Sequence, residues 1–332
     1  MPARGCGRFS RIIAPSCPIQ CQGSRRAGEI EVPVVDAVNI DRADFAMRNW
    51  HGAEPGPFLI GSDAHKRLFC RMLLETHHPY KPAVIAWPEL SDEALRRLTS
   101  LPIWDIAVQK ESCATVRVQT FAQSVTDPLL RQALDLDASE EARHKAVLTR
   151  LAETYGIPLS PEREYPPPPD PHWAWLLTGF SECIDVFFAF GLFEVARRTG
   201  FFPPKLIDAF EPVIQEECRH ILFFANWVAW HKRNMPWWRR PLFLFKTCRL
   251  WLHLIRERVA IARGIRAGGR GRDANFTMTG SGSIGVRLKP RELIDLCLAE
   301  NERRMAGYDP RLLRPTTVPR LARLVRWLLA TP

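Results

Sequence analysis

The stretch IQEECRHILFF, residues 214–224, places two glutamates, an arginine and a histidine directly before apolar and aromatic residues. A near-copy, SEEARHKAVL, occupies residues 139–148, and both stretches contain Glu-Glu-x-Arg-His. On a helix, the second glutamate and the histidine of each copy share one face. Because unpaired buried charge is costly, two such faces beside a core predict a metal site.

The centre of the chain predicts four helices. They cover residues 104–125, 127–156, 172–200 and 204–233. Pro128 suits a helix start and Gly156 suits an end, with a break near Asp137 left open. The Pro-rich residues 157–171 predict an extended crossover between the second and third helices. Two helical hairpins joined by one long crossover form the ferritin-like four-helix bundle, an all-α fold.

Distances from the turn of each hairpin indicate further candidate ligands. Two residues equally far from the turn lie side by side on the two antiparallel helices. In the first hairpin, Glu111 and Glu141 are equally far from Thr126. Glu111 is also the only carboxylate of its helix apart from Asp105, near the helix start. Glu111 is therefore predicted to share a metal site with Glu141.

In the second hairpin, Glu182 and Glu217 lie at nearly equal distances from the turn at Thr199 and Gly200. Asp185, one turn away, is an open competitor, whereas Glu194 is expected at an exposed helix end. The candidate catalytic and metal-binding residues are Glu111, Glu141, His144, Glu182, Glu217 and His220. Such carboxylates and imidazoles suit two metal ions of borderline hardness.

The doubled motifs resemble those of ferritin-like di-iron carboxylate proteins, among them bacterial multicomponent monooxygenase hydroxylases and acyl-carrier-protein desaturases. The resemblance covers residues 104–233 and concerns the metal site, not the reaction. It implies two iron ions (Fe/Fe, with Mn/Fe as an option). In the monooxygenase pattern an Asp before the ligand Glu supports a ligand histidine; Glu140 and Glu216 stand there in this chain. Arg143 and Arg219 would then pair with acids outside the metal site.

The net charge of +10 lies mainly in the flanks. Residues 1–28 hold five arginines and no acid, and they predict a disordered tail. A partly irregular, partly helical lead-in is expected over 29–100, the bundle over 101–234, and a basic, aromatic-rich helical extension over 235–332. Extra helices are thus expected on both sides of the bundle.

Two interpretations of the basic extension have equal weight. Residues 235–272 and 310–332 mix cations with Trp, Phe and Leu, as helices lying on a membrane surface do. Alternatively, they pack on the bundle with their cationic side chains pointing outward. Nucleic acid ranks lower because no RNA-binding motif is present. The chain lacks an uncharged apolar run long enough for a membrane span, so no transmembrane helix is expected.

The leading functional hypothesis is a di-iron oxygenase or oxidase that uses O2 on an apolar substrate, such as a lipid or acyl chain. No flavin, NAD or Fe–S motif is visible, so an external electron donor, a reductase or ferredoxin, is expected. Alternatives are a ferroxidase or rubrerythrin-like protein, a tRNA-modifying di-iron hydroxylase, and a non-enzymatic membrane-docking protein. Scattered cysteines without a CxxC pair favour a cytoplasmic location, with membrane association as an option. The oligomeric state stays open, with a homodimer as one option.

Overall fold

The computed structural model describes residues 37–82, 87–266 and 289–329, with side chains described from residue 39 to 259 and from 289 to 329. The chain separates into two units, residues 1–36 and 37–332, and every described residue belongs to the second. Within the described ranges the protein is all-helical and contains no strand. The predicted tail over 1–28 lies outside the described residues, and the finer divisions at 100 and 234 stay predictions.

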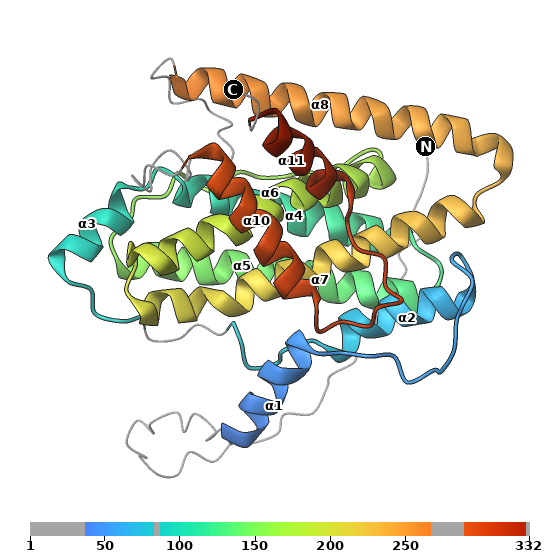
Figure 1. Ribbon diagram of the computed structural model, residues 1–332, viewed down its shortest axis with the longest axis horizontal. Helices are drawn as coiled ribbons and strands as arrows, with labels where there is room; N and C mark the ends of the chain where they lie inside the picture. Colours follow the sequence, from blue (N-terminus) through green and yellow to red (C-terminus); the bar gives the residue numbers. More distant parts are fainter. Residues whose placement is uncertain (1–36, 83–86, 267–288, 330–332) are drawn as a thin grey trace, which may run out of the picture. The chain divides into compact units, whose positions relative to one another are not determined.

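Four long helices pack around a shared interior (Figure 1). They are α4 (Trp104–Ser124), α5 (Pro128–Thr154), α6 (Pro171–Thr199) and α7 (Pro204–Asn234). Short turns join α4 to α5 and α6 to α7, so each pair is antiparallel, and residues 155–170 cross between the pairs without helix. The four predicted helices and the predicted crossover are confirmed.

Local chemistry sets the ends of these helices. The Asp127 carboxylate accepts a hydrogen bond from the Leu130 amide at 2.9 Å and caps α5, whose first residue is a proline. Asp170 caps α6 in the same way, 2.8 Å from the Trp173 amide. Gly200 ends α6 in the left-handed region at φ 63°. Asp127 and Gly200 thus mark the two turns from which the distances to the predicted metal ligands are counted.

The break near Asp137 that the sequence left open is absent, because α5 runs without interruption from Pro128 to Thr154. Aspartate is a poor helix former because its side chain competes for backbone hydrogen bonds. Here the Asp137 side chain is instead buried in the interior, with Oδ1 3.6 Å from His220 Nε2. The ionic contact explains why an aspartate stands inside a helix.

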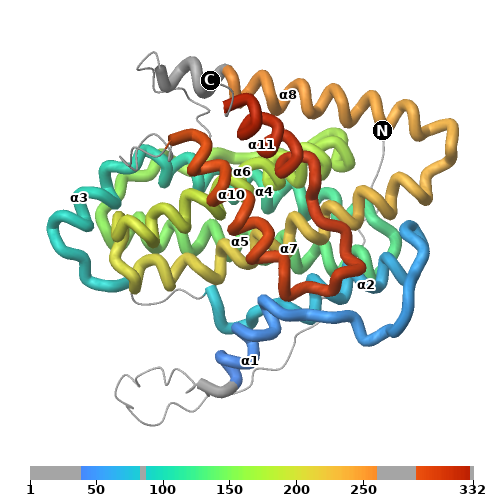
Figure 2. The backbone as a smooth tube through the Cα atoms, viewed as in Figure 1, coloured from blue at the N-terminus to red at the C-terminus, as the bar shows by residue number. Residues whose placement is uncertain are grey.

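Further helices flank the four on two sides (Figure 2). On the N-terminal side are α1 (Ala37–Arg48), α2 (Asp63–Glu75) and α3 (Asp92–Ser100). On the C-terminal side are η1 (Trp237–Arg239), α8 (Arg240–Arg266), α10 (Pro290–Met305) and α11 (Thr317–Leu328). α2 packs across α5 and α7, whereas α8, α10 and α11 all contact α6. The helical extensions predicted on both sides are therefore present.

α6 is long and apolar enough to cross a membrane by length and composition, which the sequence analysis did not anticipate. More than half of its apolar stretch, 56%, is buried inside the protein. Trp175, Leu176, Phe187 and Phe190 on this helix belong to the main hydrophobic cluster. A core helix passes the same test, so the apolarity of α6 is weak support for a span.

Candidate metal centre

The candidate ligand residues lie inside the four central helices. Ligand atoms of Glu111, Glu141, His144 and Glu217 all lie within 4.8 Å of one another. A second group, within the same limit, consists of Asp137, Glu141 and His220. Glu141 is common to both groups, so they adjoin. The geometry thus brings five of the six predicted residues into one buried carboxylate–histidine cluster that can hold a metal ion.

Two residues show where sequence reasoning was incomplete. Glu182 lines the same cavity as Glu111, Glu141 and Glu217, but it is not a member of either group. Its role as a ligand stays a prediction. Asp137 was not among the predicted ligands, whereas it belongs to the second group. Its position one turn before Glu141, on the same helical face, was the signal that pointed to it.

Each histidine reaches across to the other motif. His144 Nδ1 lies 3.2 Å from Glu217 Oε1, and His220 Nδ1 lies 2.9 Å from Glu141 Oε1. On the other side of each ring, Nε2 is 2.9 Å from Glu216 Oε2 for His144 and 2.8 Å from Glu140 Oε2 for His220. A carboxylate at Nε2 favours a proton on that nitrogen and leaves Nδ1 as the ligand atom.

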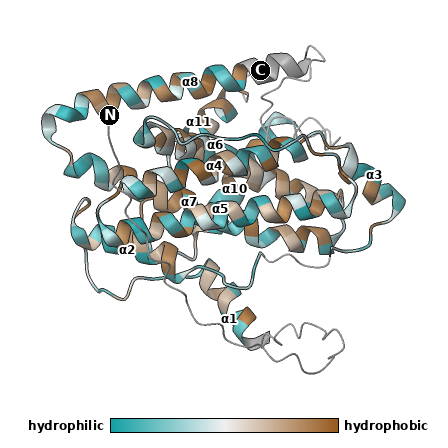
Figure 3. Cartoon of the chain, turned by 180° about the vertical axis from the view of Figure 1, so that it is seen from behind, coloured by the Kyte–Doolittle hydropathy of each residue, from teal (hydrophilic) through white to brown (hydrophobic). Residues whose placement is uncertain are grey.

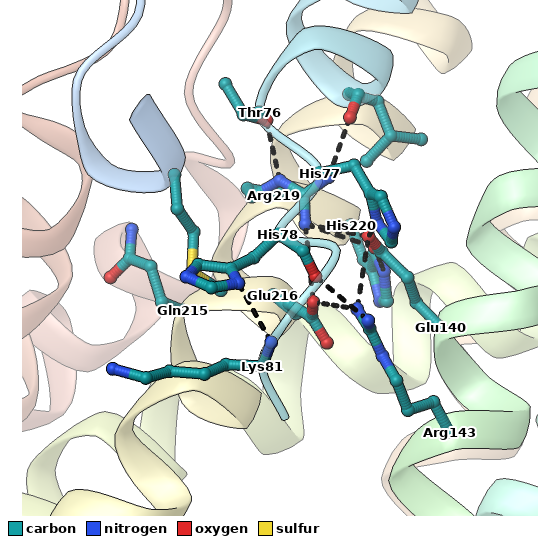
Figure 4. A network of polar contacts seen from close by, with 12 residues as sticks. Thr76, His77, His78, Lys81, Glu140, Arg143, Gln215, Glu216, Arg219 and His220 are labelled. Atoms are coloured by element: carbon teal, nitrogen blue, oxygen red, sulfur yellow. Dashed lines mark hydrogen bonds and ion pairs between the residues drawn. The ribbon is translucent and has the colours of Figure 1, made fainter. Parts of the chain in front are cut away.

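Glu140 therefore orients His220, and Glu216 orients His144, so each glutamate orients the histidine of the opposite motif. Each is also paired with the arginine of the opposite motif. Arg219 NH1 donates to both oxygens of Glu140, at 3.0 and 3.1 Å, and Arg143 donates to Glu216 (Figure 4). The expectation that both arginines pair with acids outside the metal site is confirmed.

The end of α2 and the segment after it complete this network, which no sequence pattern indicated (Figure 4). Arg219 donates to Thr76 Oγ1 and to the Leu73 carbonyl, each at 2.7 Å. Arg143 donates to the His78 carbonyl at 3.0 Å, and His77 Nδ1 is 2.7 Å from Glu140 Oε1. One chain segment outside the four helices thus anchors both arginines.

The donor atoms inside the cluster test whether a metal fits. Glu141 Oε1, His144 Nδ1 and His220 Nδ1 are buried, and their close contacts with one another and with Glu217 lack the geometry of a hydrogen bond among the described residues. Such atoms are rare in folded proteins because each costs free energy. All three face the interior of the cluster, where a metal ion would be coordinated by them. Oxygen and imidazole nitrogen donors suit iron or manganese.

The pKa values describe the same crowding of negative charge. Burial raises the pKa of Glu111, and it raises the pKa of Glu141 well above its ordinary value. The nearby Glu217 carboxylate increases both shifts. Burial, with Glu217 again, raises the pKa of Glu182 to about 8. Burial raises the pKa of Asp137 to about 6. Without a metal, protons neutralise this charge, and a cation can take their place.

The competing acids of α6 have cationic partners. Asp185 accepts from Arg258 NH2 at 3.0 and 3.1 Å and also from Lys110. Glu194, expected at an exposed helix end, is instead buried, because Arg197 and Arg198 fold over it. The bonds to both arginines lower the pKa of Glu194 to about 2. Glu182 is therefore the α6 acid whose carboxylate lacks such pairing within the described residues.

A cavity of about 200 Å³ opens onto the cluster. Its inner end is bordered by Glu111, Glu141, Glu182 and Glu217. The remaining wall is mostly apolar and reaches side chains near the α6–α7 turn, among them Phe202, Leu206 and Phe210. Phe187 and Phe223 belong to the hydrophobic core and do not line the cavity.

Comparison with known proteins returned no match: no family model, no curated protein and no solved structure is similar to this chain. The site is therefore described from its own residues. They form a helical protein with a buried carboxylate–histidine cluster that can bind a metal ion.

Proposed function

We propose that the chain is a ferritin-like di-iron oxygenase or oxidase that acts with O2 on an apolar substrate. The observation that carries this proposal is the crossed arrangement of the histidines. Each Nδ1 faces a glutamate of the other motif, and each Nε2 is held by an outer glutamate. Two equivalent half-sites with a shared carboxylate suit a pair of metal ions.

The chain's residues would hold and orient this pair. His144 and Glu217 would serve one ion, and His220 with Asp137 the other. Glu141 would contribute to both, since it belongs to both groups. The bound iron pair would supply the activation of O2. Glu140, Glu216 and their arginines keep the imidazole rings oriented for coordination.

The apolar cavity supports a role in oxidising an apolar molecule. Its walls exclude water from the cluster and would position a hydrocarbon chain beside the carboxylates. A ferroxidase needs a polar route along which hydrated Fe²⁺ enters, because an apolar wall opposes the passage of ions. The cavity therefore favours the oxygenase over the ferroxidase alternative. Electrons would come from an external reductase or ferredoxin.

A single-turnover experiment tests this function. Protein loaded with Fe(II) without oxygen is exposed to O2 together with a saturated fatty acid, and oxidised products are measured by mass spectrometry. We expect a hydroxylated or desaturated product from the native chain. Ala189→Phe, which narrows the cavity away from the predicted ligands, should abolish product while iron is retained. Equal product from both proteins would contradict a role for the cavity.

A further inference from the structure

α8 has apolar side chains on two opposite faces. On the inner face, Phe243, Leu250 and Leu254 are buried, and the helix packs on α6. A second apolar row, whose members are three, four or seven residues apart and so share one helical face, points away from the protein. It consists of Phe245, Leu252, Ile255 and Val259, with exposures of 67%, 54%, 50% and 42%. Apolar and polar residues alternate along α8 in Figure 3. The outer row lacks a packing partner among the described residues.

The apolar surface continues beyond α8. Trp237 and Trp238, in the short helix η1 that precedes it, are 77% and 58% exposed. The Arg239 guanidinium lies over the Trp238 ring at 4.7 Å. α11, which also packs on α6, exposes Leu321, Leu324, Val325 and Trp327. Soluble proteins seldom expose so many large apolar side chains on neighbouring elements without a binding role.

The charge around this surface has one sign. Residues 232–259 contain eight Lys or Arg residues and a single acid, Glu257. That acid is already paired with Arg258. Arg249 and Arg256 lie on α8 beside the outer apolar row. The surface that α8 presents is therefore apolar in its middle and cationic along its edge.

We propose that the outer face of α8, together with Trp237 and Trp238, docks on the surface of an anionic phospholipid bilayer. The helix would lie in the plane of the interface, with the row from Phe245 to Val259 among the acyl chains. Arginines would contact the lipid phosphates, and the two tryptophans would sit at headgroup level. Docking of this kind does not depend on the metal centre.

The same observations argue against other occupants. A second copy of the chain would place this cationic surface against itself, because a two-fold interface is self-complementary. Like charges facing each other across an interface are costly. Nucleic acid would satisfy the arginines, but the outer row is mainly aliphatic and gains nothing from phosphates or base stacking. A bilayer satisfies both the aliphatic side chains and the cations.

Docking through α8 also bears on the source of the substrate, a step that rests on the proposed function. The inner face of α8 supplies Arg258, whose side chain bonds to Asp185. Asp185 and Lys110 line the cavity beside the carboxylate cluster. The docking helix therefore contacts a residue of the cavity wall. This arrangement assigns the apolar substrate to the bilayer, as a lipid or its acyl chain.

Vesicle co-sedimentation of the full chain, with and without iron, tests the docking. We expect binding to phosphatidylserine–phosphatidylcholine vesicles, weaker binding to phosphatidylcholine alone, and loss of binding as salt is added. The double variant Leu252→Glu/Ile255→Glu should bind at least about tenfold more weakly. Phe45→Glu is the matched control, because Phe45 is 67% exposed on α1, which lies across the protein from α8 (Figure 1). It should bind as the native chain does.

The charge contribution is tested separately with Arg249→Gln/Arg256→Gln. Its control is Arg131→Gln/Arg150→Gln, which changes two exposed arginines of α5. Absence of binding to anionic vesicles overturns the proposal, as does equal binding by the α8 variants and their controls. A native dimer that the Leu252→Glu/Ile255→Glu change dissociates also overturns it. Vesicle binding by a chain that takes up no iron would refute the proposed function and leave the docking intact.

Discussion

His220 Nε2 lies 2.8 Å from Glu140 Oε2, although these residues belong to different motifs on different helices. The reciprocal contact joins His144 to Glu216 at 2.9 Å. Each copy of the motif is thus completed by the other, so neither helix can form the site alone. The doubled motif is therefore a structural requirement, and single-residue changes in one copy should affect ligands of the other.

Glu140→Gln removes the charge that balances Arg219 inside the protein. Both side chains are fully buried, so the arginine would keep a buried charge without its full partner. We expect a loss of about 3–5 kcal/mol in the free energy of unfolding, measured by urea denaturation. Glu153→Gln on the same helix changes an exposed pair with Arg150 and should cost less than about 1 kcal/mol. Similar losses in both variants would show that the buried pair has no special role.

Asp137→Asn tests the residue that the sequence analysis missed. The change keeps the shape of the side chain but removes a carboxylate from the group of Asp137, Glu141 and His220. Metal affinity, measured by competition with a chelator, should fall by about 10- to 100-fold. Asp135→Asn, at an exposed position of the same helix, should leave affinity unchanged. Unchanged affinity in Asp137→Asn would remove Asp137 from the site.

Metal-free protein should become less stable as pH rises from about 7 to 8, above the range in which the histidines with lowered pKa values, such as His172, lose their protons. Glu182 has its pKa raised by burial from an ordinary value of 4.5 to about 8. Between these two pKa values the folded protein holds a proton on Glu182 that the unfolded chain has lost. The stability that this proton contributes is lost as pH rises through about 8. The raised pKa values of Glu141, His144 and His220 act in the same direction.

Thermal unfolding of chelator-treated protein across this pH range is the measurement. Glu182→Gln cannot lose a proton, so its melting temperature should fall less steeply with pH. Iron-loaded protein should show a smaller slope than metal-free protein, since the cation replaces the protons. A melting temperature that rises between pH 7 and 8 in metal-free protein would contradict the charge crowding.

Gly191→Ala tests the contact between α6 and α10. A Cβ at this position would lie 2.3 Å from Cys297 Sγ and 3.1 Å from the Cys297 backbone nitrogen. We expect a loss of about 1–3 kcal/mol in the free energy of unfolding. Cys297→Ala removes the sulfur but leaves the backbone contact. The loss that Gly191→Ala causes in a chain already carrying Cys297→Ala should therefore be smaller than its loss in the native chain. Additive effects of the two changes would mean that the helices do not meet here.

The sequence predicted the four central helices because proline starts, glycine ends and long apolar runs are local signals. It also predicted that Glu111 of α4 and Glu141 of α5 would meet, as they do in the carboxylate–histidine cluster, since equal distances from a short turn translate directly into equal heights. The contacts of α10 and of the segment from Thr76 to His78 with the central helices were not anticipated. Their roles depend on contacts with residues far along the chain, such as Arg219 with Thr76, which no local pattern encodes.

Asp137 and Glu194 were misjudged for a related reason. The helix propensity of aspartate suggested a break, but burial beside His220 decides its conformation. The neighbouring arginines suggested an exposed end at Glu194, whereas they fold back and cover the carboxylate. At Asp137 a contact with another helix outweighed the local preference, whereas at Glu194 ion pairs within the same helix cover the carboxylate.

Iron content after anaerobic loading tests the central claim most directly. The native chain, loaded with Fe(II) and freed of excess metal, should retain about two iron ions. His144→Ala/His220→Ala removes both inward-facing Nδ1 atoms and should retain almost none, while His253→Ala, an exposed histidine of α8, should match the native chain. A folded native chain that retains no iron, or a double variant that retains as much as the native chain, would contradict the di-iron assignment.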